Sequence, residues 1–115
     1  MSVTIYHNPR CSKSRETLAL LETQGVTPTI VEYLKTPINL EQLETLLTQL
    51  SYRSAHQLVR NKEALYKELA LTPETPESTL KNAMIDNPKL IERPIVVSNN
   101  QAAIGRPPES VLAIL

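Results

Sequence analysis

Hydrophobic and polar positions alternate at the start of the chain and then change to a helical period. Residues 2–6 alternate and are rich in β-branched side chains, which predicts a strand ending before His7. From Ser12 the apolar positions follow a helical stripe, made of Leu18, Ala19 and Leu21. Gly25 stands where a helix C-cap would fall, and the run 29–33 predicts a second strand. Strand, helix and strand over this length predict a right-handed crossover between parallel strands.

The middle of the chain, about 39–86, carries consecutive helical patterns. Asn39 and Gln42 form a capping-box pair in front of a stripe of leucines, at positions 40, 43, 46, 47 and 50. A similar pair, Ser54 and Gln57, predicts a short turn through Arg60. We therefore expect a block of short helices here.

Two further helices complete this block. Asn61 is the predicted cap of a helix carrying Ala64, Leu65 and Leu69. Thr75-Pro76-Glu77 predicts another helix start, with the proline at the first helical position, and Asn87-Pro88 predicts its end.

The last part of the chain returns to strand patterns. The runs 95–98 and 101–104 are separated by Asn99-Asn100, a pair that tolerates the positive φ of a tight hairpin turn. A final helix is predicted over Glu109–Leu115, with a stripe at Val111, Leu112 and Leu115. The order βαβ, helical block, ββα is typical of a thioredoxin-like α/β fold. We expect one domain over residues 1–115, with a mixed four-stranded sheet and a helical insertion at about 39–86.

Composition and charge narrow the function classes. Twelve basic and twelve acidic residues among 115 cancel, so no global field favours nucleic acid or an anionic membrane. A single cysteine excludes an internal disulfide, and no secretory or membrane-spanning apolar run is present, so we expect a cytoplasmic protein. His7 and Cys11 lack further clustered ligands, so we expect no metal site and no bound cofactor. We also expect the chain to act as a monomer.

Cys11 is the first candidate for chemistry. It stands at the predicted start of a helix, where unpaired amide donors and partial positive charge stabilise a thiolate. His7 lies four residues upstream, and Arg10, Lys13 and Arg15 flank the thiol, so their charges are expected to lower its pKa further. A lone cysteine is usually a small buried apolar residue. The polar and cationic flanks favour a reactive thiol here.

The residue three places after the thiol limits its redox chemistry. In thioredoxin-like folds the reactive cysteine commonly belongs to Cys-x-x-Cys, in which the second sulfur resolves a mixed disulfide. This chain has Ser14 at that place, which cannot close a disulfide. Any redox turnover of Cys11 therefore needs an external thiol.

Three distant arginines stand at predicted element boundaries: Arg60, Arg93 before Pro94, and Arg106 after Gly105. If these boundaries converge on the thiol loop, several guanidinium groups would surround one thiolate and suit a tetrahedral oxyanion. For each arginine alone, a solvated surface position is the commoner outcome.

The sequence resembles the glutaredoxin-coupled arsenate reductase family over nearly its whole length. The matching segments are 6–15 (Tyr-His-Asn-Pro-Arg-Cys-Ser-Lys-Ser-Arg), 60–62, 91–97 and 105–107. The resemblance implies that the Cys11 thiolate attacks arsenate while Arg60, Arg93 and Arg106 hold the oxyanion. Glutathione then attacks as co-substrate, and glutaredoxin clears the mixed disulfide.

The resemblance also implies supporting roles for four residues. His7 and Ser14 are expected to stabilise the thiolate, Pro94 to follow a cis peptide bond that places backbone beside the sulfur, and Arg15 to support the site. Because arsenate is a dianion near neutral pH, a thiolate that attacks it needs fixed positive charge to offset the repulsion.

Other functions stay open at this level. A glutathione-dependent thiol oxidoreductase of the same fold would use the same basic site on another substrate. A Spx-like regulator that binds RNA polymerase is disfavoured, because redox-switched members carry Cys-x-x-Cys. A cysteine-dependent phosphatase needs Cys-x-x-x-x-x-Arg, and Thr17 stands at the arginine's place.

Overall fold

The computed structural model describes residues 2–115, and the chain folds into two compact units. The first contains the chain up to Thr36 together with Arg93–Leu115, and the second is the segment Pro37–Glu92. The second unit therefore interrupts the first, and it contains the insertion predicted at 39–86. The prediction of a single domain concerns both units together and stays a prediction.

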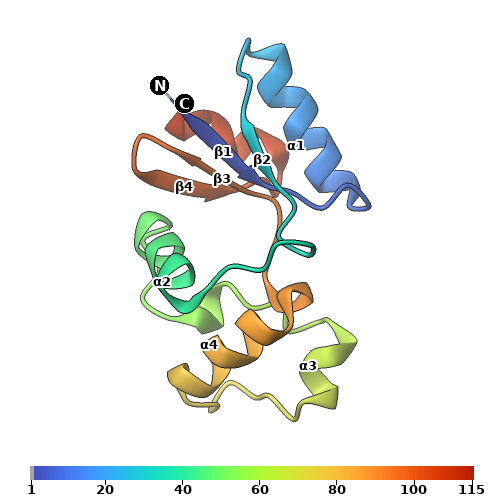
Figure 1. Cartoon of the computed structure of the whole chain (residues 1–115), viewed down its shortest axis with the longest axis vertical. Helices are drawn as coiled ribbons and strands as arrows, with labels where there is room; N and C mark the ends of the chain where they lie inside the picture. The colour runs from blue at the N-terminus through green and yellow to red at the C-terminus, as the bar shows by residue number, and fades with distance from the viewer. Residues whose placement is uncertain (1) are drawn as a thin grey trace. The chain divides into compact units, whose positions relative to one another are not determined.

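The first unit is built on a mixed four-stranded sheet (Figure 1). Its strands are β1 (Val3–Tyr6), β2 (Thr29–Val31), β3 (Ile95–Ser98) and β4 (Gln101–Ile104), in the order β2-β1-β3-β4. β1 pairs in parallel with β2 and antiparallel with β3, and β3 pairs antiparallel with β4. The thioredoxin-like sheet is confirmed, although the second strand ends at Val31 rather than at residue 33.

The hairpin between β3 and β4 follows its sequence signal. Asn99 and Asn100 have φ values of 54° and 61°, the left-handed conformation that the prediction required. In the register Ile95 lies opposite Ile104 and Ser98 opposite Gln101. This tight turn fixes where β4 ends, and Gly105 and Arg106 follow directly.

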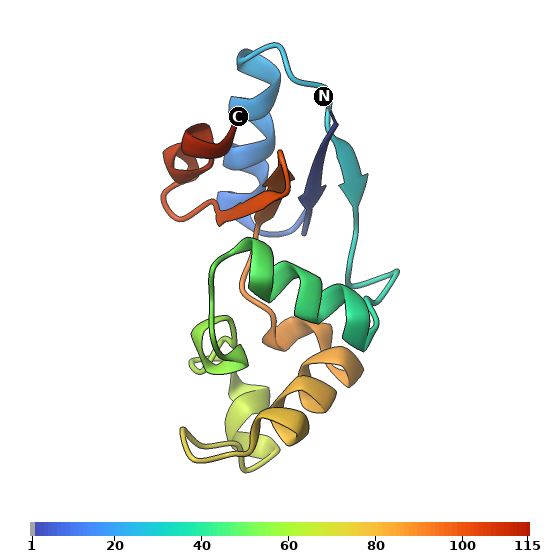
Figure 2. The same cartoon turned by 90° about the vertical axis from the view of Figure 1, so that its left-hand side faces the viewer.

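Helix α1 (Ser12–Thr23) and the 3₁₀ segment η3 (Pro108–Ile114) cover one face of the sheet (Figure 2). The core between these layers contains Val3, Ile5, Leu21, Val96 and Val111. The predicted stripe on α1 was partly wrong, because Ala19 is exposed. The buried face of α1 is formed by Ser14, Thr17 and Leu21, which follow a spacing of three and four residues.

The final helix was predicted with α-helical spacing, and this was wrong. η3 is a 3₁₀ helix with about three residues per turn, so residues three apart share a side. Val111 is buried and Ile114 packs against the same core. Leu112 and Leu115 are exposed.

The second unit is helical. It contains α2 (Leu40–Gln49), the 3₁₀ segment η1 (Ala55–Gln57), α3 (Ala64–Glu68), α4 (Glu77–Asp86) and the 3₁₀ segment η2 (Pro88–Leu90). Both predicted capping boxes are present: Asn39 with Gln42, and Ser54 with Gln57. The backbone around Val59 also pairs with that around Ile91 in an isolated antiparallel bridge, which the sequence did not signal.

Three local predictions in this unit were wrong. The N-cap of α3 is Glu63 rather than Asn61, and Pro76 is the N-cap of α4 rather than its first helical residue. Leu40 and Leu69, which were assigned to apolar faces, are exposed. Each error falls at or next to a helix end. A helix boundary that is misplaced by one residue there changes which side chains are expected on the apolar face. None of the helices within residues 2–115 is long and apolar enough to cross a membrane.

Candidate active site

The loop between β1 and α1 is closed by hydrogen bonds of its backbone and of the Asn8 and Arg15 side chains. The carbonyl of Asn8 accepts a hydrogen bond from the Cys11 N–H at 3.0 Å, and its side-chain Oδ1 accepts one from the Arg10 N–H at 3.0 Å. Arg15 donates from Nη1 to the carbonyl of Pro9 at 2.9 Å and so ties α1 back to the loop. Arg15 therefore contacts the thiol loop, and its supporting role in the site stays a prediction.

Cys11 is the N-cap residue of α1. Its backbone is extended (φ −94°, ψ 124°), and its carbonyl accepts the Arg15 N–H at 3.0 Å. A side chain at this position lies beside the unpaired amide donors of the first turn, where serine or aspartate oxygens usually accept hydrogen bonds. The residue is 8% exposed. Cys11 therefore lies at the helix end that stabilises negative charge, although its side chain makes no capping hydrogen bond in this structure.

Ser14 links His7 to the first turn of α1. Its Oγ lies 2.6 Å from Nδ1 of His7 and accepts a hydrogen bond from the Asn8 N–H at 3.0 Å. Ser14 is fully buried, and His7 is 6% exposed. The predicted pair is thus brought together in the wall of the thiol loop.

Burial lowers the pKa of His7. The charge of Arg15 lowers it further, while that of Glu32 acts in the opposite direction. His7 is therefore a neutral hydrogen-bonding group near neutral pH. Its contact with the loop through Ser14, rather than a positive charge of its own, is the contribution that the geometry offers.

Arg106 reaches the sulfur. Its Nη2 lies 3.7 Å from Sγ of Cys11, and its Nε donates to the carbonyl of Arg93 at 2.8 Å. The Gly105 N–H donates to the carbonyl of Pro94 at 3.0 Å, so the segments before β3 and after β4 lie side by side. The peptide bond before Pro94 is cis, as the resemblance implied, and the bond before Pro107 is also cis.

Arg60 belongs to the second unit. Its Nη1 lies 3.1 Å from Oε2 of Glu63, and its Nε lies 3.7 Å from Oε1 of Glu92. Its backbone N–H donates to the carbonyl of Leu90 at 2.7 Å, within the bridge described above. Of the three predicted arginines, the first unit brings together Arg93 and Arg106. The convergence of Arg60 on the thiol stays a prediction.

Sequence reasoning missed two residues that the structure places behind this site. Thr17 is fully buried on α1, and its hydroxyl donates to the carbonyl of Lys13 at 2.8 Å. Gly105 packs directly against Thr17 and Pro94. A signal was available, because the chain has only two glycines and Gly25 is accounted for by its positive φ of 78°.

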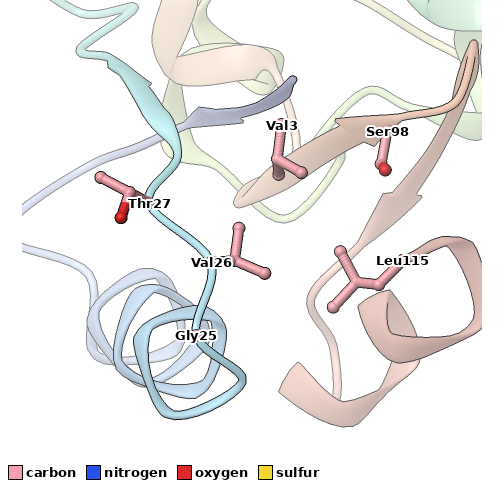
Figure 3. A pocket seen from close by; sticks show the side chains of 6 residues that line it. All are labelled: Val3, Gly25, Val26, Thr27, Ser98 and Leu115. Atoms are coloured by element: carbon pink, nitrogen blue, oxygen red, sulfur yellow. The ribbon is translucent and has the colours of Figure 1, made fainter. Parts of the chain in front are cut away.

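A pocket of about 300 Å³ lies at the other end of β1 and α1 from the thiol (Figure 3). Its lining residues are Val3, Gly25, Val26, Thr27, Ser98 and Leu115. None of the predicted site residues belongs to this set. Over residues 2–115, no three His, Cys, Asp or Glu side chains form a group that could hold a metal ion.

Comparison with known proteins places these features in a family. Residues 6–114 match the ArsC family. The chain is 59% identical to a protein called YfgD from Escherichia coli over 98% of this chain and 96% of that one. It is 46% identical to a protein named arsenate reductase from Neisseria meningitidis, over 98% and 97% of the two chains. A solved structure named arsenate reductase from Vibrio cholerae superposes with a TM-score of 0.96 at 56% identity, covering 100% and 98% of the chains.

Proposed function

The chain belongs to the ArsC family, and on that premise we propose that it reduces arsenate to arsenite through the Cys11 thiolate. One observation carries the proposal: Arg106 Nη2 lies 3.7 Å from the sulfur of Cys11, which is the N-cap residue of α1. A guanidinium group and a helix N-terminus together favour both the thiolate and an incoming oxyanion. The names of the relatives supply the identity of that oxyanion.

The proposed reaction consists of three successive nucleophilic attacks by thiolates. The Cys11 thiolate attacks arsenic(V), an arsenate oxygen leaves as water after protonation, and a sulfur–arsenic bond forms. Glutathione thiolate then attacks Cys11 Sγ, the sulfur–arsenic bond breaks, and its electron pair reduces the arsenic to arsenite. The enzyme is left as a mixed disulfide with glutathione. A glutaredoxin thiolate then attacks the glutathione sulfur of this disulfide, which releases the Cys11 thiolate and leaves glutathione bound to glutaredoxin through a new disulfide.

The residues around the thiol have separate tasks in this proposal. Arg106 and Arg93, joined by Arg60, hold the arsenate oxygens and the charge that moves to the leaving oxygen. Ser14, held by His7, stabilises the thiolate loop. Arg15 and Pro94 support the site from the two sides.

The external reductants follow from the sole cysteine. Because Cys11 has no partner thiol in the chain, a disulfide can form only with another molecule. The family resemblance implies which molecules these are, and we propose glutathione as co-substrate and glutaredoxin as partner, in a cytoplasmic monomer with no resident cofactor.

The decisive experiment measures arsenite formed by the purified protein with arsenate, glutathione and glutaredoxin, and with each of the three omitted in turn. We expect repeated turnover to arsenite only in the complete mixture, at most one arsenite per enzyme when glutaredoxin is omitted, and none without arsenate or glutathione. Turnover of a glutathione mixed disulfide without arsenite would instead identify a thiol oxidoreductase that acts on another substrate. Absence of both activities would overturn the redox proposal.

A further inference from the structure

Gly105 is where three parts of the candidate site meet. It follows β4 directly, precedes Arg106, and is buried. Its N–H donates to the carbonyl of Pro94 at 3.0 Å, and its Cα side faces Thr17 of α1. α1 carries Cys11 at its N-cap, so one residue touches the elements that supply the sulfur and both neighbouring arginines.

The requirement for glycine at this place is steric. Gly25 is the chain's glycine with a positive φ, and Gly105 has an ordinary backbone conformation. A methyl group at position 105 would collide with Oγ1 of Thr17. It would also lie 2.9 Å from Cγ of Pro94 and 3.0 Å from Cγ2 of Thr17.

The neighbours have little freedom to move away. Thr17 is fully buried, its β-branched side chain is stiff, and its hydroxyl is bonded to the Lys13 carbonyl at 2.8 Å. Pro94 is buried and is part of a ring-constrained backbone. A side chain at 105 would therefore move α1 or the end of β4, and each movement changes the separation of Cys11 and Arg106.

We propose that Gly105 is a positioning residue: by allowing β4 to close onto Thr17 and Pro94, it sets the Arg106 guanidinium against the Cys11 sulfur. This inference deepens the proposed function and rests on it for its catalytic meaning. The geometric statement, however, can be tested without arsenate. It predicts that a side chain added at position 105 moves the Arg106 guanidinium away from the Cys11 sulfur. It also predicts that shortening the Thr17 side chain in the same variant restores their separation.

The test uses the single thiol as its own probe. Alkylation rates of Cys11 are measured with anionic iodoacetate and neutral iodoacetamide, and their ratio reports positive charge near the sulfur. Arg106→Ala should lower the ratio about fivefold, the factor by which two unit charges about 4 Å apart attract in water. Gly105→Ala should lower it most of the way to the Arg106→Ala value.

Two double variants separate crowding from other effects. Gly105→Ala with Thr17→Ala removes the two Thr17 atoms that the methyl group would meet, leaves the contact with Pro94, and should return the ratio toward the wild-type value. Gly105→Ala with Thr17→Val keeps the branched shape and should remain low, although both double variants lose the hydrogen bond to Lys13. Thr17→Val alone should keep the wild-type ratio.

Circular dichroism establishes that each variant is folded. If Gly105→Ala does not fold, Thr17→Ile carries the same test, because it fills the contact from the α1 side and should lower the ratio likewise. A wild-type ratio in the folded filling variant, or equal rescue by alanine and valine at 17, would overturn the proposal. Arsenite formation by the wild-type protein and the variants is measured in parallel. If the wild-type protein forms no arsenite while the variants still change the alkylation ratio as expected, the proposed function is overturned and the positioning role of Gly105 stands.

Discussion

The two units use their arginines in opposite ways. In the helical unit, Arg60 lies 3.1 Å from a Glu63 oxygen and 3.7 Å from a Glu92 oxygen. In the sheet unit, Arg106 donates to the carbonyl of Arg93 and lies 3.7 Å from the Cys11 sulfur. The contacts of Arg60 are with the carboxylate groups of two glutamates. The contact of Arg106 is with a group whose charge depends on its chemical state, so its strength changes during a reaction at the sulfur.

A second pair of contacts shows the same division. Each unit contains a serine hydroxyl 2.6 Å from a titratable side chain, Ser14 with His7 and Ser54 with Glu77. The Glu77 carboxylate also accepts the Ala55 N–H at 2.8 Å, so it ties α4 to η1 and stabilises the unit. The His7 pair is buried beside the thiol loop. Similar local chemistry therefore serves the fold in one unit and borders the candidate site in the other.

The strongest test of this division replaces the sulfur itself. We expect Cys11→Ser to lower arsenate reduction more than about 10³-fold, as loss of a nucleophile does in other enzymes. Because serine is a preferred N-cap residue, the urea midpoint should stay unchanged or rise. Cys11→Ala is the matched control that loses the nucleophile and does not introduce the capping hydroxyl of serine. Arsenite formation by Cys11→Ser would remove the thiolate from the mechanism.

The next test removes the guanidinium group beside the sulfur. Arg106→Ala should cost about 1.5–3 kcal/mol of charge-assisted hydrogen bonding, which corresponds to a loss of about 10- to 150-fold in kcat/KM for arsenate. Arg106→Lys should recover part of this loss, because it restores the charge without the fork. Arg53→Ala removes an exposed arginine from the helical unit and serves as the control. Equal kinetics in the Arg106 and Arg53 variants would place Arg106 outside the oxyanion site.

Local signals in the sequence predicted most of the fold. The Asn39 and Ser54 capping boxes, the Asn99-Asn100 turn and the glycine after α1 each act within a few residues, so the chain reveals them directly. The 3₁₀ geometry of η3 was missed, because apolar residues at 111, 112 and 115 fit an α-helical stripe before packing is known. Element type was therefore more secure than helix geometry.

The site was predictable only in part. Cys11 at a helix start and Ser14 three places later are local facts. The contact of Arg106 with a sulfur 95 residues away in sequence depends on strand order. The burial of Thr17 against Gly105 depends on how closely α1 approaches β4, and a threonine on a helix is usually expected on a polar face. Residue type alone carries no information on such close approaches.

A smaller effect is expected from the carboxylate of the helical unit. Burial raises the pKa of Glu77, but the hydrogen bonds from Ser54 and the Ala55 N–H, with the charges of His56 and Lys81, lower it more, so the net pKa lies below the ordinary 4.5. A lowered folded-state pKa gives stability that is present above the unfolded-state pKa and lost as pH falls through the folded value.

Glu77→Gln should therefore destabilise the protein near neutral pH by about 1 kcal/mol, the usual net worth of such hydrogen bonds. The difference from wild type should shrink below about pH 4, the range in which a free glutamate is protonated. Urea midpoints measured between neutral and acidic pH test both statements. A difference that is constant with pH would show that the Glu77 charge does not contribute.

The smallest expected effect is that of a substitution at Glu63, and it tests directly whether Arg60 binds the oxyanion as Arg106 is proposed to do. Glu63→Gln removes one carboxylate from Arg60, and because both side chains are partly exposed it should cost only about 0.2–1 kcal/mol in free energy of unfolding. If Arg60 also holds the oxyanion, as the resemblance implies, removal of its competing carboxylate should lower the KM for arsenate a few-fold. Glu41→Gln, on the exposed first turn of α2, controls for the loss of one negative charge. An unchanged KM in Glu63→Gln, together with a KM for Arg60→Ala equal to wild type, would assign Arg60 to the fold of the helical unit alone.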